Sequence, residues 1–102
     1  TIQVKTNRGS RRAWMLSDKA EHLKSPTLFY VFVNLNDSGP ATFHVVDSEI
    51  VANYIRETHR EWLSGRRRDG GERRDSSIRK FRDDEGKYRD AWERLGLAGR
   101  ER

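Results

Sequence analysis

The strongest strand signal in the chain lies at residues 28–35, which read LFYVFVNL. Most of these residues are aromatic or β-branched, and both types favour the extended backbone of a strand. Apolar side chains occupy both of its alternating faces, so neither face is suited to water. The segment therefore predicts a central strand that is covered on both sides, around which the other elements must be arranged.

The residues that follow predict a hairpin and then a helix. A cluster of turn-forming residues at 36–40 leads to residues 42–46, in which polar and apolar side chains alternate. We expect this second strand to pair back on the first. Apolar side chains then recur three and four positions apart, which is typical of a helix with one buried stripe. Asp47 or Ser48 should begin this helix, and residues 64–65 should end it.

The start of the chain predicts two shorter strands. Residues 2–6 alternate between apolar and polar side chains, and a basic loop at 7–12 connects them to an apolar segment at 13–16. We expect the two strands to form an antiparallel hairpin, with Gly9 supplying a positive φ in the loop. A short helix should follow at 18–23.

The C-terminal third combines a polar loop with a final helix. Residues 65–77 include no apolar side chain and predict a basic, mobile loop. Ile78 and Phe81 indicate a short turn anchored in the core. Apolar residues four and three positions apart predict a helix at 87–95, and the acidic run at 83–85 suits the start of that helix because it complements the helix dipole.

Together these elements predict one α+β (α/β) domain over residues 1–102, with a mixed four-stranded sheet and helices packed on it. The chain is too short for two cores. Its residues are 33% hydrophobic and 36% charged, which indicates a small core beneath a heavily charged surface.

The charge is unevenly distributed along the chain. The net charge is +5, and residues 64–82, with eight Lys/Arg and three Asp/Glu, account for all of it. This favours a polyanion as partner, with nucleic acid first and an anionic membrane surface second; a solvated arginine-rich loop is the simpler alternative. No apolar run is long enough to cross a membrane. The chain has no cysteine, and we expect a cytoplasmic protein.

The histidines and tryptophans favour structural roles. His22, His44 and His59 lie on three different predicted elements, and none has a metal-ligand partner three or four residues away. Their spacing therefore gives little support to a zinc site. Each tryptophan lies on an apolar stripe, which favours core packing over stacking on bases.

Several phrases of the sequence, taken together, resemble a known family. They are QVKT at 3–6, WMLS at 14–17, LFYVFVN at 28–34, FHVV at 43–46, HREWL at 59–63, IRKF at 78–81, GKY at 86–88 and the tryptophan at 92. On these residues the chain is similar to small, mostly uncharacterised bacterial proteins of the restriction-endonuclease-like, PD-(D/E)XK, nuclease superfamily.

The resemblance implies a Mg²⁺-dependent phosphodiester hydrolase. In that superfamily an Asp on one strand and a Glu, Asp or Gln on the next hold Mg²⁺, and a Lys two residues further on orients the attacking water. Carried over to this sequence, Gln3 is the metal ligand and Lys5 the catalytic lysine. Both would lie on one face of the first strand, as the chemistry requires.

The sequence departs from the family's catalytic motif in two ways. Gln3 is neutral and so a weaker Mg²⁺ ligand than a carboxylate. The partner acid, with the first helix and strands of the fold, would lie before Thr1, so we expect a fragment that binds no Mg²⁺ and cuts no DNA by itself. The alternatives are a non-catalytic module that binds nucleic acid or protein through its arginine-rich loop, and an adaptor that retains the fold without the chemistry.

Arginines in two loops are the candidate contacts to nucleic acid, with DNA as the expected partner. They are Arg8, Arg11 and Arg12 in the first loop and Arg66, Arg67 and Arg68 in the second. If an upstream strand normally pairs with residues 2–6, the first strand exposes an unpaired edge. We therefore expect a homodimer formed through that strand, or an exchange of strands between copies.

Overall fold

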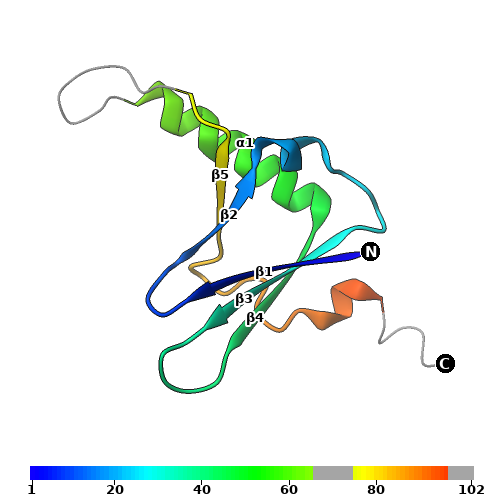
Figure 1. Cartoon of the computed structure of the whole chain (residues 1–102). Coiled ribbons are helices and arrows are strands. Elements are labelled where there is room, and N and C mark those ends of the chain that lie inside the picture. Colours follow the sequence, from blue (N-terminus) through cyan, green and yellow to red (C-terminus); the bar gives the residue numbers. More distant parts are fainter. Residues whose placement is uncertain (66–74, 97–102) are drawn as a thin grey trace.

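The computed structural model describes residues 1–65 and 75–96 (Figure 1). In this part of the chain, five strands in two small sheets accompany one α-helix, so the fold is α+β. The elements in chain order are β1 (Ile2–Arg8), β2 (Ala13–Ser17), the 3₁₀ helix η1 (Asp18–His22), β3 (Phe29–Leu35), β4 (Thr42–Asp47), helix α1 (Ser48–Ser64), β5 (Ile78–Arg82) and the 3₁₀ helix η2 (Trp92–Leu95). None of the helices described here is long and apolar enough to cross a membrane.

The larger sheet confirms the prediction made for residues 28–35. Its order is β1–β3–β4, with β3 in the centre. β3 runs parallel to β1 and antiparallel to β4, so the predicted hairpin of β3 and β4 is also confirmed. The central strand is buried over residues 30–34, because side chains from other elements cover both of its faces.

The predicted hairpin of the first two strands is wrong, because β1 and β2 belong to different sheets. β2 pairs antiparallel with β5, which brings Trp14 opposite Phe81, and these two strands form a ribbon of their own (Figure 1). Trp14 and Leu16 share one face of β2 and are both buried. A hairpin with β1 would place these large side chains beside the polar face of an edge strand, whereas the ribbon covers the apolar centre of the sheet.

The segment at 78–81 is strand β5 and not the expected turn. Arg79 and Phe81 face inward, and Ile78 and Lys80 face solvent. This period of two is the pattern of a half-buried strand. The single four-stranded sheet of the prediction is therefore replaced by a three-stranded sheet and a two-stranded ribbon.

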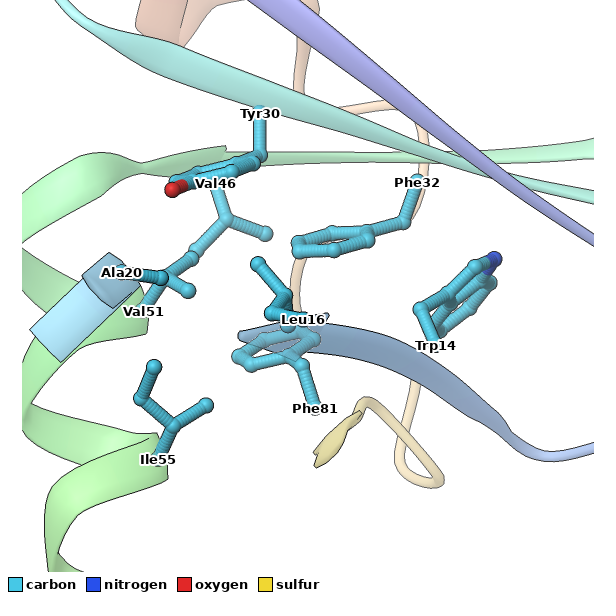
Figure 2. Close-up of a cluster of buried hydrophobic side chains, with 9 residues drawn as sticks. All are labelled: Trp14, Leu16, Ala20, Tyr30, Phe32, Val46, Val51, Ile55 and Phe81. Carbon is cyan, nitrogen blue, oxygen red and sulfur yellow. The ribbon is translucent and has the colours of Figure 1, made fainter. Parts of the chain in front are cut away.

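The main core lies between the ribbon, the sheet and α1 (Figure 2). Phe32 from β3 stacks on Phe81 from β5, with ring centroids 4.7 Å apart and planes 10° from parallel. Tyr30 stacks on the other side of Phe32, at 5.5 Å. Its hydroxyl is buried without a hydrogen-bond partner in the described residues, and burial raises the pKa of this group. The nine buried residues of this main core are Trp14, Leu16, Ala20, Tyr30, Phe32, Val46, Val51, Ile55 and Phe81.

Helix α1 begins and ends where the sequence predicts. Asp47 precedes its first turn, but its carboxylate accepts no hydrogen bond from that turn. Instead it accepts one from Arg94 Nη1 at 3.2 Å, which ties the start of α1 to η2. Asp47 therefore marks the beginning of the helix and also links it to the C-terminal segment.

The predicted final helix at 87–95 is wrong, apart from the short η2 and its end at Gly96. The carboxylate of Asp83 accepts the backbone N–H groups of Lys87 and Tyr88, both at 2.9 Å, and so fixes a turn. The backbone then pairs with the outer edge of β4, where Val45 N–H donates to the Tyr88 carbonyl at 3.0 Å. Backbone groups that bond to β4 cannot also form the bonds of a helix.

The outer edge of β1 is the open edge of the three-stranded sheet, since the described residues place no strand beside it. Ile2 and Val4 are 50% and 61% exposed on one face of this strand. Val4 lies beside Val31, so the exposed face continues the apolar surface of β3. An open edge with apolar side chains is suited to adding another strand.

We expect β1 of one copy to pair with β1 of a second. Sedimentation at high protein concentration should show a dimer, and Val4→Lys should convert it to a monomer because a lysine at the edge opposes strand addition. Leu23→Lys changes another exposed apolar side chain away from this edge and should leave the dimer intact. A monomeric parent chain would contradict the prediction.

Candidate nucleic-acid interface

Two buried asparagines at the end of the larger sheet fix the loop that follows β1. The register of β1 and β3 places Asn7 opposite Asn34, and Asn34 Nδ2 donates to Asn7 Oδ1 at 2.6 Å. The same Nδ2 donates to the Arg11 carbonyl at 3.1 Å, and Asn7 Nδ2 donates to the Ala13 carbonyl at 2.9 Å. The backbone on either side of Arg12 is therefore held against the sheet.

Gly9 makes the turn that sends this loop toward the ribbon. Its φ is +64°, as predicted, and its N–H donates to the Leu35 carbonyl at 3.0 Å. A Cβ at this position would lie 3.0 Å from Asp37 Oδ2. Glycine is required here because both the positive φ and the close carboxylate disfavour a side chain.

The loop and the ribbon enclose a hollow of about 360 Å³ beside Lys5. Among the described residues, four cations from three parts of the chain line it, and no acidic side chain does. None of the four forms an ion pair with a carboxylate in the described residues. Like charges around a solvent-filled hollow create a positive potential that attracts anions. The four cations of this basic hollow are Lys5, Arg11, Arg12 and Lys80.

Lys5 and Gln3 lie on the same face of β1, as their spacing predicts, and both are partly buried. Lys5 lines the basic hollow, whereas Gln3 does not. No three His, Asp or Glu side chains come together in the described residues in a way that could hold a metal ion. A single neutral amide oxygen does not make a Mg²⁺ site, so these residues do not fit the metal that the resemblance implies.

The predicted arginines separate into different groups. Arg11 and Arg12 line the basic hollow, but the exposed Arg8 does not. Arg8 lies at the end of β1, on the face that also carries Val4. Arg66, Arg67 and Arg68, with most of the predicted loop at 65–77, fall outside the described residues.

Lys80 is the cation that sequence reasoning missed. The β2–β5 register places it opposite Met15, on the exposed face of the ribbon. The alternation of residues 78–82 is typical of a strand. Lys80 comes near Lys5, however, only because β5 pairs with β2, and these strands lie far apart in the sequence.

Comparisons with protein-family models, with curated proteins and with solved structures give no match to this chain.

Asn34→Ala should lower the free energy of unfolding by about 2 kcal/mol, because Asn7 Oδ1 and the Arg11 carbonyl each lose a donor. Denaturant unfolding followed by tryptophan fluorescence measures the change. Asn36→Ala removes an exposed bond to the Pro40 carbonyl and should cost less than about 1 kcal/mol. Equal effects of the two substitutions would show that the buried amide does not hold the loop.

Proposed function

We propose that this chain binds nucleic acid, with backbone phosphates lying in the basic hollow beside Lys5. The observation that carries this proposal is that four cations and no carboxylate line the hollow in the part of the chain that the structure describes. Guanidinium groups match phosphate oxygens through paired hydrogen bonds, and lysine adds a mobile point charge. Contacts of this kind recognise the backbone and carry no sequence preference by themselves.

The distribution of charge supports a polyanion over a small anion. Lys80 belongs to residues 64–82, the part of the sequence that carries the whole net charge of +5. The exposed Arg11 and Arg12, which line the same hollow, come from the loop after β1. A long, regularly charged chain can contact both segments at once, and the release of its counterions favours binding. DNA is the first candidate.

A Mg²⁺-dependent endonuclease site is the second candidate, favoured by the position of Lys5. Lys5 lines the hollow in which we place the phosphodiester, and a lysine that orients the attacking water would need this position. Lys5 also shares its face of β1 with Gln3. Hydrolysis in this mode needs at least one carboxylate to hold the metal. No carboxylate from residues 1–65 or 75–96 lines the hollow, so cleavage would depend on a carboxylate from elsewhere.

Arg11→Glu/Arg12→Glu should weaken binding to duplex DNA by at least about tenfold at 100 mM salt. The slope of log K against log salt should become shallower by about 2, because two phosphate contacts are lost. Fluorescence anisotropy with a labelled duplex over a series of salt concentrations measures both values.

Lys19→Glu/Lys24→Glu is the matched control for this experiment. It makes the same change in net charge at two exposed lysines that do not line the basic hollow, and it should affect affinity much less. An unchanged slope in the arginine variant, or equal losses in both variants, would show that the hollow is not where DNA binds.

Purified chain should bind plasmid DNA but not cut it in the presence of Mg²⁺ or Mn²⁺, because no carboxylate of the described residues lines the hollow beside Lys5. Agarose gels of supercoiled plasmid report nicking and linearisation. Metal-dependent cutting that disappears in Lys5→Ala would overturn this expectation and would establish the endonuclease reading.

A further inference from the structure

A second hollow, of about 590 Å³, borders the same loop, and a histidine is among its lining residues. Arg11 and Arg12 border both hollows, so the two are neighbours. His44 from β4 lines the second hollow, and Arg82 and Arg89 from the C-terminal part of the chain border it. His44, Arg82 and Arg89 take no part in the proposed contacts beside Lys5, because they do not line the basic hollow.

His44 is held rigidly by its neighbours. Its Nδ1 lies 2.8 Å from Asp83 Oδ2, and both side chains are largely buried, with 9% and 3% of their surface exposed. The imidazole also packs against Trp14, with ring centroids 5.1 Å apart, and the Trp14 indole N–H donates to the Val33 carbonyl at 2.8 Å. The ring is therefore fixed in place before any ligand arrives.

The bond to Asp83 determines which nitrogen of His44 is available. An ionised carboxylate only accepts hydrogen bonds, so Nδ1 is protonated and donates a hydrogen bond to Asp83. Nε2 has no hydrogen-bond partner in the described residues. Nε2 is a bare acceptor when the ring is neutral and becomes a donor when the ring is protonated.

The charges around the second hollow leave room for an anion. The Asp83 carboxylate already accepts bonds from His44 and from two backbone N–H groups, and Asp84 pairs with Arg82 at 3.1 Å. Arg11, Arg12 and Arg89 have no carboxylate partner in the part of the chain described here. Of the described residues, three arginines without a carboxylate partner and one histidine thus line this hollow, and the two carboxylates that line it already have partners.

We propose that the second hollow binds a phosphate group of the same nucleic-acid strand, held by Arg11, Arg12 and Arg89, and that His44 takes up a proton to donate a hydrogen bond to it. This inference rests on the proposed function. It adds that binding is linked to pH, since neutral Nε2 repels a phosphate oxygen and protonated Nε2–H bonds to it. The strand would then cross the loop at Arg11 and Arg12.

The test is the affinity for a labelled single-stranded oligonucleotide at pH 5.5 and pH 7.5, at constant ionic strength. Binding by the parent chain should be about fivefold to tenfold tighter at pH 5.5. His44→Asn keeps an N–H donor toward Asp83 while it removes Nε2, and this variant should bind equally at the two pH values. Arg89→Gln should weaken binding at both. Thermal unfolding of each variant verifies that the fold is retained.

Lys5→Gln separates this inference from the proposed function. It should weaken binding at both pH values and leave the ratio between them unchanged. If the parent chain binds neither this oligonucleotide nor the labelled duplex, the proposed function fails. If the parent chain binds and His44→Asn keeps the full pH dependence, the second hollow is not a proton-linked phosphate site.

A spectroscopic readout follows His44 directly. The imidazole resonances of His44 should shift on addition of inorganic phosphate, because a bound anion changes the surroundings of the ring. Those of the exposed His22 serve as an internal control. If phosphate shifts the resonances of Lys5 but not those of His44, the role of His44 is limited to its hydrogen bond with Asp83.

Discussion

The hydrogen bond from the Trp14 indole to the Val33 carbonyl, 2.8 Å long and buried, joins the ribbon to the sheet. The rest of the structure depends on this junction. With the indole in place, the ring packs against Phe32 on one side of the core and against His44 at the edge of the second hollow. An indole N–H buried in an apolar core would be costly without a partner, so this bond allows the ring to be buried in one orientation.

The same junction explains how a small core can support a charged surface. The ribbon covers one face of β3 with Trp14 and Phe81, while its outer face carries Lys80. The loop between β1 and β2 must pass over the end of the sheet to reach the ribbon, and Asn7 and Asn34 hold it there. The positive hollows are therefore a consequence of how the two sheets are connected, and their position is set by buried amides and not by the cations themselves.

Sequence patterns predicted the local structure correctly where the residues of one segment determine its conformation. Residues 28–35 are apolar on both faces and form the central strand, and Gly9 adopts the positive φ expected of it. Sequence patterns failed where a distant segment binds the backbone groups that the predicted element would use itself. The residues near position 90 have helical spacing, but the Asp83 carboxylate and the edge of β4 bind their backbone groups. Periodicity describes only which side chains share a face, and cannot reveal a competing partner from a distant strand.

The sequence by itself determined the α+β class, the central strand with its hairpin, helix α1, the shared face of Gln3 and Lys5, and the basic character of the chain. Each follows from side chains close together in the sequence, whose types limit the local backbone. Only the tertiary structure decided that β2 pairs with β5, that Lys80 joins Lys5, Arg11 and Arg12, and that His44 meets Asp83 beside them. These contacts join residues far apart in the chain, and burial of Trp14, Leu16 and Phe81 selects them over the hairpin that local spacing favours.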